Sequence, residues 1–250
     1  MPEAKWENKD KLRLDLKEDP VWRLHKHYLD LQNNHVFLFP WEDLAGTDVC
    51  EEGGEPGVEY TMANRFIMNA RLCMMTNPGA PMVVHQKTCG GDWNEGIAIF
   101  DMLVTYPYET TILNYTHARS MSSMTFQAAT KRVMMPHSHF MFHDGEYGDY
   151  GTVKKVRSGF EFSDKTDDVM MDIYSRRMKQ QGMFKSWSYK RIKEMMRELM
   201  DKKEDVYLTA KETVEWGLAD EIFNGSWADL SKYTPEQVTR GNEYAAYFLK

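Results

Sequence analysis

The stretch TTILNYTHARSMSSMTFQAA, residues 110–129, decides the fold. Its first part, Thr110 to Tyr115, is apolar and β-branched, which is typical of a buried strand. Its last part, Met121 to Ala129, is rich in small and apolar residues and predicts a buried helix. Ser120 therefore stands at the junction where a strand ends and a helix begins.

Strands and helices are predicted to alternate on both sides of this stretch. Short apolar runs predict further strands at 35–39, 82–85, 137–143 and 206–208. Apolar residues spaced by three and four, together with helix start and stop residues, predict helices at 61–76, 92–104, 167–182, 190–203 and 209–216. This alternation indicates an α/β domain with mainly parallel strands, whose functional residues gather at the ends of strands.

Composition and charge exclude several classes of protein. The chain has 250 residues, of which 42% are hydrophobic, so it can bury a large core. A net charge of -7 argues against nucleic-acid binding. No apolar run is long enough to span a membrane, and the N-terminus lacks an apolar signal segment. Cys50, Cys73 and Cys89 are odd in number without CxxC spacing, so we expect no disulfide framework and a reducing, cytoplasmic location.

Two short motifs are candidates for chemistry. Gly90-Gly91 lies between a predicted strand and a predicted helix, where glycine permits a tight turn or lets backbone amides face a ligand or oxyanion. Ser120 is either a helix N-cap or a nucleophile exposed at the strand end, with the amide of Met121 pointing out of the helix start. The local sequence leaves both alternatives open for each motif.

The histidines of PHSHFMFHDG, residues 136–145, form a third candidate. Alternation along a strand places His137, His139 and His143 on one face, where they are structural, bind a metal or supply a general base. No carboxylates at helical spacing lie nearby, which argues against a metal site, and we expect no cofactor. Asp205, between a charged helix and a short strand, is by itself one acidic residue on a solvated segment.

Taken together, these segments resemble the Clp protease proteolytic subunit (ClpP) family. The resemblance covers roughly Tyr28 to Phe223, and the 29 residues from Gly91 to Ser120 are the family's separation. Four segments match in the family's order: YTMANRFIMNARLC (60–73), CGGDWNEGIAIFDML (89–103), HARSMSSM (117–124) with KRVMMPHSHFMFHDG (131–145), and EDVYLTAKETVEWGLADEI (204–222). Such ordered segments are more specific than any single motif, and they favour the catalytic alternative at each candidate.

The resemblance implies an α/β fold of the ClpP/crotonase-like kind, a superhelix of repeated β-β-α units with a protruding helical handle. It divides the chain into an N-terminal arm (1–27), a peptidase domain (28–224) with its handle at about 150–203, and a C-terminal extension (225–250). The acidic, glycine-rich loop at 46–59 is expected to be an insertion.

The same resemblance assigns roles to single residues. Ser120 is expected to be the nucleophile, His143 the general base, and Asp205 the residue that orients the histidine. The amides of Gly91 and Met121 are expected to form the oxyanion hole.

The resemblance also implies a substrate and an assembly. Gly90, Asp92 and Trp93 are expected to bind an extended substrate strand. The chain is then a serine endopeptidase that cleaves peptides or unfolded proteins through an acyl-enzyme, inside a tetradecamer of two stacked heptameric rings.

Departures from the family bear on partners and alternatives. The positions that line the family's docking pocket for an AAA+ ATPase unfoldase fall near Val83 and His85 and are not aromatic here, which argues against docking. Stand-alone phage members of the family mature viral heads, and this sequence looks similar to them. Two alternatives are a non-catalytic ring-forming subunit, against which the complete triad speaks, and a crotonase-type acyl-CoA enzyme, which shares the fold but uses no such triad.

Overall fold

The computed structural model describes residues 20–40, 55–146, 148 and 150–250. Most of the predicted arm, residues 46–54 of the predicted insertion, and Cys50 lie outside this part of the chain. The strands are β1 (Leu29–Asp30), β2 (His35–Leu38), β3 (Met82–Thr88), β4 (Thr110–Arg119), β5 (Lys131–Met134), β6 (His139–Phe142), β7 (Val206–Thr209) and β8 (Glu221–Ile222). The helices are α2 (Pro20–His27), α3 (Tyr60–Thr76), α4 (Trp93–Val104), α5 (Met121–Gln127), α6 (Val153–Gln180), α7 (Tyr189–Lys203), α8 (Ala210–Glu215) and α9 (Pro235–Phe248).

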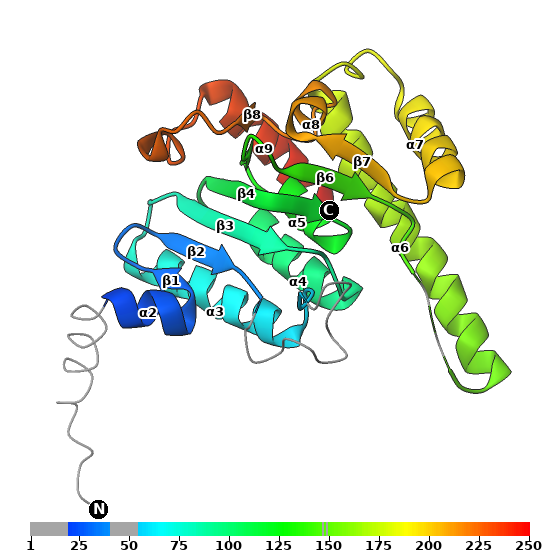
Figure 1. Ribbon diagram of the computed structural model, residues 1–250, viewed down its shortest axis with the longest axis horizontal. Coiled ribbons are helices and arrows are strands. Elements are labelled where there is room, and N and C mark those ends of the chain that lie inside the picture. Colours follow the sequence, from blue (N-terminus) through cyan, green and yellow to red (C-terminus); the bar gives the residue numbers. More distant parts are fainter. Residues whose placement is uncertain (1–19, 41–54, 147, 149) are drawn as a thin grey trace, which may run out of the picture.

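The strands form one sheet in the order β1-β2-β3-β4-β5-β8, in which β1 alone along this path runs antiparallel to its neighbour (Figure 1). One side of β4 pairs with two different strands along its length. Its residues 111–114 pair with β5, and its residues 117–119 pair with β6, both in parallel. β7 then pairs with β6 in the antiparallel direction. The predicted α/β architecture with mainly parallel strands is therefore confirmed.

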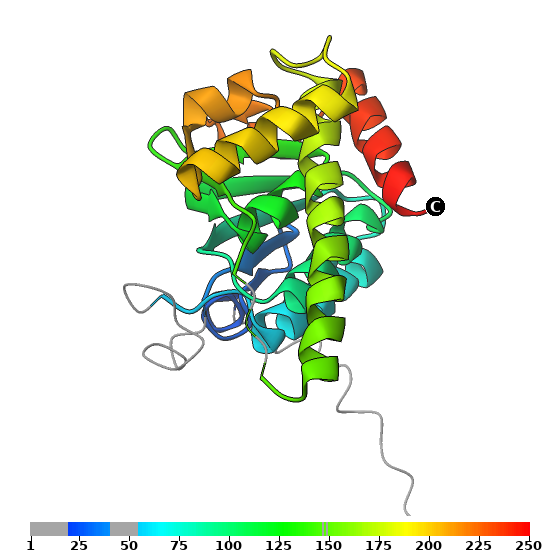
Figure 2. The same ribbon diagram turned by 90° about the vertical axis from the view of Figure 1, so that its right-hand side faces the viewer.

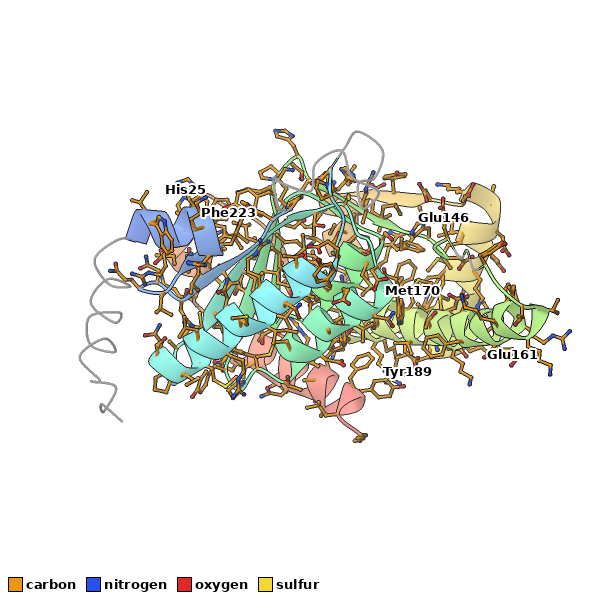
Figure 3. All side chains as sticks on the ribbon, turned by 90° about the horizontal axis from the view of Figure 1, so that it is seen from below. His25, Glu146, Glu161, Met170, Tyr189 and Phe223 are labelled. Carbon is orange, nitrogen blue, oxygen red and sulfur yellow. The ribbon has the colours of Figure 1, made fainter. Side chains whose placement is uncertain are left out.

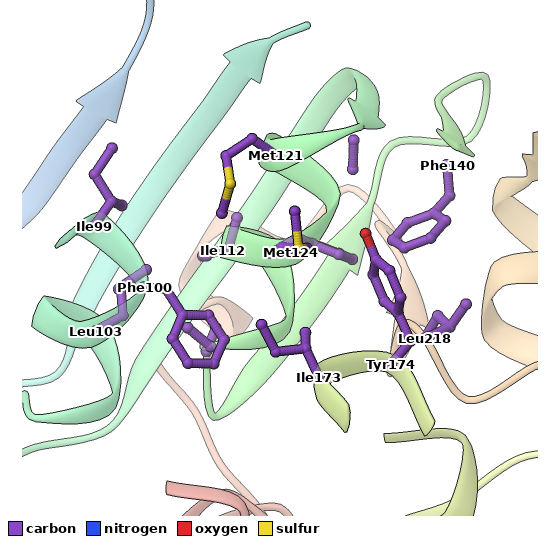
Figure 4. Close-up of a cluster of buried hydrophobic side chains, with 14 of the residues drawn as sticks. Ile99, Phe100, Leu103, Ile112, Met121, Met124, Phe140, Ile173, Tyr174 and Leu218 are labelled. Carbon is purple, nitrogen blue, oxygen red and sulfur yellow. The ribbon is translucent and has the colours of Figure 1, made fainter. Parts of the chain in front are cut away.

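Helices α3, α4 and α5 pack beside one another against one face of this sheet (Figure 1). The apolar face of α4, with Ile99 and Phe100, lies against Ile112 of β4 and against Met121 and Met124 of α5 (Figure 4). Each such side chain that leaves water stabilises the fold by about 1.5–3 kcal/mol. This core fixes α5, and so fixes the junction at its start.

Helix α6 begins at Val153, so the predicted start at Asp167 was wrong. Thr152 caps the helix, its hydroxyl accepting from the Lys155 amide at 3.3 Å. The first buried residue of α6 is Met170, so the preceding half has no apolar stripe that periodicity could detect. This half projects away from the sheet, as Figures 2 and 3 show, with Glu161 near its free end.

Strand β5 was not predicted, because its first two residues, Lys131 and Arg132, are charged and suggested a loop. All four residues of β5 are buried. Lys131 pairs with Glu221 at 2.9 Å, and Arg132 pairs with the buried Asp220 at 3.0 Å. Burial alone would raise the pKa of Asp220, but the charge of Arg132 and its hydrogen bonds outweigh this effect and lower it.

The C-terminal segment packs on α6. The hydroxyl of Tyr244 in α9 donates to the Ile173 carbonyl at 3.1 Å, and Gln180 donates to the Arg240 carbonyl at 3.0 Å. Cys73 and Cys89 are both buried. None of the described helices is long and apolar enough to cross a membrane.

The Arg132–Asp220 pair generates a stability prediction. We expect Asp220→Ala to lower the free energy of unfolding by about 3–5 kcal/mol at pH 7, because it leaves buried arginine charge uncompensated. The native pKa of Asp220 lies below its unfolded value of about 3.9, so its contribution is present above that pH and is lost as the pH falls through the native pKa. Urea unfolding between pH 7 and pH 3 measures both effects.

The matched control is Glu236→Ala, which removes an exposed partner of Arg240 four residues away. An exposed pair of this kind contributes about 0.5 kcal/mol or less. Equal losses in the two variants would show that the buried pair has no special role in stability.

Candidate active site

Ser120, His143 and Asp205 lie at the ends of three neighbouring strands. Ser120 directly follows β4, and its amide donates to the Met141 carbonyl of β6 at 3.1 Å. His143 directly follows β6, which runs parallel to β4. Asp205 directly precedes β7, which runs antiparallel to β6, so the start of β7 lies at the same edge of the sheet. The topology therefore brings together three residues that are far apart in sequence.

The three side chains form a continuous chain of polar contacts. His143 Nε2 lies 2.8 Å from Ser120 Oγ, and His143 Nδ1 lies 3.2 Å from Asp205 Oδ1. A carboxylate only accepts hydrogen bonds, so the ring proton of a neutral imidazole belongs on Nδ1. Nε2 is then an acceptor that faces the serine hydroxyl. This arrangement can remove a proton from Ser120 as its oxygen attacks an electrophile.

The backbone of Ser120 has φ 50° and ψ -131°, a left-handed conformation that is uncommon for a residue with a side chain. Ser120 occupies the N-cap position of α5, yet its side chain makes no capping hydrogen bond. The hydroxyl is directed to His143 instead. Non-glycine residues with positive φ cluster at functional sites, where surrounding structure holds them.

The two glycines lie directly beside Ser120. The amide of Val58 donates to the Gly90 carbonyl, and the amide of Asp92 donates to the Val58 carbonyl at 2.8 Å. These two hydrogen bonds form a short parallel bridge between Val58 and Gly91, and neither uses the amide of Gly91. Gly91 is exposed. A Cβ on Gly90 would lie 2.7 Å from the Cβ of Ser120, so only glycine fits there.

The other predicted residues of this region also adjoin the serine. Met121 follows Ser120 in the chain, and its side chain is buried against Gly96 of α4. Asp92 caps α4, its side chain accepting from the Glu95 amide at 3.0 Å. Trp93 begins α4 and is partly buried.

Ser120 and His143 lie where two cavities meet. The larger has a volume of about 1200 Å³ and extends toward β7 and the end of α7. The smaller has a volume of about 370 Å³ and extends toward α6; its lining includes Gly91, Asp92, Trp93, Met124, Phe162, Met170 and Tyr174. A chain that crosses from one cavity to the other would pass over the serine hydroxyl.

The three histidines do not share one environment. His143 contacts Ser120 and Asp205 as described, whereas His137 is exposed in the turn before β6. The strand therefore begins at His139, two residues later than predicted. The ring of His139 lies 5.7 Å from that of His117, and burial lowers the pKa of both. Within the described residues, no group of three His, Cys, Asp or Glu side chains is placed to hold a metal ion.

Sequence reasoning missed Tyr207, whose hydroxyl donates to Asp205 Oδ2 at 3.2 Å. This oxygen is the one that does not face His143. Burial, followed by the charge of Asp205, raises the pKa of Tyr207. The spacing of Asp205 and Tyr207 could have indicated this contact, because side chains two residues apart in an extended segment point to the same side.

The fold and the site define a class, that of α/β proteins with a Ser–His–carboxylate arrangement at strand ends, in the chain order Ser, His, Asp. The family model of Clp protease matches residues 55–226, and the chain belongs to this family. It is thus a member of a family of peptidases, which decides against the crotonase alternative. The resemblance found in the sequence is confirmed.

Similar proteins carry the description ATP-dependent Clp protease proteolytic subunit. The one from Deinococcus radiodurans is 24% identical over 67% of this chain and 76% of its own length. The one from Chlorella vulgaris is 28% identical over 70% of this chain and 79% of its own. Proteolytic subunit 2 of Thermobifida fusca is 23% identical, with coverage of 68% and 78%.

The close approach of Gly90 to Ser120 generates a second prediction. We expect Gly90→Ala to slow the reaction of Ser120 with a fluorophosphonate about a hundredfold or more, because the new methyl group displaces the serine. Labelling kinetics on the folded protein measure this.

Gly79→Ala is the control, since Gly79 also has positive φ, at +86°, but its Cβ would meet nothing within 4 Å. It shares the backbone strain without the clash. If both variants reacted at the same reduced rate, backbone strain in general, and not the contact with Ser120, would be responsible.

Proposed function

We propose that the chain is a serine endopeptidase in which Ser120 is the nucleophile, His143 the general base and Asp205 the residue that orients the histidine. The observation that supports this most directly is the chain of contacts from Asp205 to His143 at 3.2 Å and from His143 to Ser120 at 2.8 Å. The membership of a peptidase family supports the reaction class.

In the first step, Ser120 Oγ attacks the carbonyl carbon of the scissile peptide bond. Its proton passes to His143 Nε2, and the carbonyl π electrons move onto oxygen. The imidazolium that forms is stabilised by Asp205, which keeps the Nδ1 proton in place. The C–N bond then breaks, the amine leaves with the proton from Nε2, and an ester to Ser120 remains.

In the second step, water replaces the amine. His143 Nε2 removes a proton from the water as its oxygen attacks the ester carbonyl. Collapse of the second tetrahedral intermediate breaks the bond to Ser120 Oγ, which regains its proton from His143. The carboxylic acid product leaves, and the site returns to its starting state.

The oxyanion of each tetrahedral intermediate needs donors beside Ser120. We assign this role to the amides of Gly91 and Met121, because Gly91 is exposed beside the serine and its amide is outside the bridge to Val58. The backbone at Gly90, Asp92 and Trp93 is proposed to pair with an extended substrate, which would lie along the two cavities.

The proposal includes self-assembly into two stacked heptameric rings, in which the projecting half of α6 is the handle. The relatives are described as ATP-dependent. The positions expected to dock an ATPase fall near His85. In this chain His85 is buried and hydrogen-bonded to His35 and Tyr115, both at 2.9 Å. We therefore propose that short peptides are cleaved without an ATPase, as in a head-maturation type of protease.

Labelling with a fluorophosphonate tests the nucleophile. We expect the wild-type protein to be labelled and Ser120→Ala to be unlabelled, with no effect of a metal chelator. Asp205→Asn should slow labelling about 10³–10⁴-fold, because the amide favours the wrong imidazole tautomer.

Thr209→Ala is the control, because it removes a hydroxyl at the end of β7 whose hydrogen bonds, among the described residues, are with Glu212 in the turn to α8. Labelling of Ser120→Ala as fast as the wild type would refute the assignment of the nucleophile.

Native mass spectrometry tests the assembly. We expect complexes whose subunit number is a multiple of seven, each subunit contributing 29.3 kDa. Shortening α6 by removal of residues 153–162 should leave single rings, since the projecting half would no longer reach a second ring. Monomers that label as fast as the assembled protein would contradict the need for a chamber.

A further inference from the structure

We propose that Tyr174 of α6 is a positioning residue for the nucleophile, acting through the hydroxyl of Ser123. This inference rests on the proposed function, since it concerns how Ser120 is held ready to react. Neither Tyr174 nor Ser123 was a candidate from the sequence, and neither touches His143 or Asp205 in the contacts described above.

Ser120 needs support because of its backbone. A positive φ is unfavourable for a residue with a Cβ, so neighbouring groups must hold it. On the amide side, Ser120 donates to Met141 of β6. On the carbonyl side, its oxygen accepts from the Ser123 amide at 3.0 Å and from the Ser123 hydroxyl at 2.6 Å. Two of these three hydrogen bonds to the backbone of Ser120 thus come from Ser123.

The direction of the hydrogen bonds follows from their partners. The Ser120 carbonyl can only accept, so the short contact with Ser123 Oγ uses the single hydroxyl proton of Ser123. Tyr174 Oη lies 2.6 Å from the same Ser123 Oγ, and must therefore be the donor there. The result is a relay in which Tyr174 donates to Ser123 and Ser123 donates to Ser120. Its polarisation strengthens the last bond.

Tyr174 is itself fixed in place. It is 1% exposed, and its ring packs against those of Phe140 and Phe142 at 5.9 and 5.8 Å, in β6, the strand that His143 directly follows. Figure 4 shows Tyr174 beside Phe140, with its hydroxyl oxygen on the side of α5. One turn further along α6, Arg177 donates to the Gln127 and Ala129 carbonyls at the other end of α5. Helix α6 thus holds α5 at both ends.

Tyr174 also lines the smaller cavity beside Ser120, which suggests a competing role as a wall of a substrate site. The two roles differ in their kinetics. Loss of a binding wall weakens the affinity for a ligand, whereas loss of positioning lowers the rate of the chemical step.

The test is Tyr174→Phe, which removes only the hydroxyl. We expect the maximal rate of fluorophosphonate labelling to fall about tenfold, while the inhibitor's KI stays unchanged. This loss is smaller than the roughly hundredfold loss that a 1 Å misplacement of a reacting group can cause. We expect Ser123→Ala to have a similar or larger effect. The double variant should be no slower than Ser123→Ala, because both changes interrupt one relay.

The chain offers a matched control. Tyr233 Oη lies 2.8 Å from Thr111 Oγ1, and Thr111 donates to the Leu230 carbonyl at 2.6 Å. This is the same kind of relay, at the opposite end of β4 from Ser120. Tyr233→Phe should cost comparable thermal stability and leave the labelling rate at the wild-type value.

A readout besides reactivity is hydrogen exchange of the Ser123 amide, which we expect to be faster in Tyr174→Phe than in Tyr233→Phe. Wild-type labelling kinetics in Tyr174→Phe, an equal loss in both tyrosine variants, or a change in KI alone would each overturn the inference. If instead Ser120→Ala is labelled like the wild type, the proposed function fails. The exchange measurement then still decides whether Tyr174 holds the peptide unit of Ser120.

Discussion

The division of β4 between two neighbours is the constraint on which the rest of the structure depends. A strand normally keeps one neighbour on each side, but β5 leaves β4 after Asn114 and β6 joins it at His117. Because β6 is parallel to β4, both strands end at the same edge, and the residues that follow them meet. The antiparallel β7 returns to that edge from the other direction. The proximity of Ser120, His143 and Asp205 is therefore a property of strand pairing.

This arrangement requires α5 to be short and firmly held, because it begins directly after Ser120 and must end before β5. The seven residues of α5 are all buried. Arg132 of β5 donates to Gln127 near its end at 2.7 Å, and the same arginine is paired with Asp220. The buried charges thus serve the site indirectly: they keep β5 in the sheet and the end of α5 in place. Packing from α4 and α6 supplies the remaining support.

Much of the fold and of the site could be predicted from sequence, and the failures have physical reasons. Ser120, His143 and Asp205 were each ambiguous alone, and only their order and spacing within a resemblance gave them roles. Strand β5 was missed because a charged residue such as Arg132 is buried only where a partner like Asp220, 88 residues away, compensates it.

The start of α6 was missed for the opposite reason, since its projecting half buries nothing and so has no apolar period. Ser123 looked like one more small residue, because its contact with Tyr174 spans 51 residues. Hydrophobic periodicity predicts which face of a helix or strand is buried. It does not predict which residues, distant in the sequence, the tertiary fold brings into contact.

The left-handed backbone at Ser120 sets the need for a hydroxyl at this position against the stability of the native state. Glycine adopts that conformation without the steric cost of about 1 kcal/mol or more that a Cβ incurs. Glycine would fit this backbone with the least strain but has no hydroxyl, so the nucleophile role proposed for Ser120 and the stability of the native state place opposite demands on this position. The Cβ of Ser120 thus lowers the stability of the native state, and the hydrogen bonds to the Ser120 backbone offset this cost.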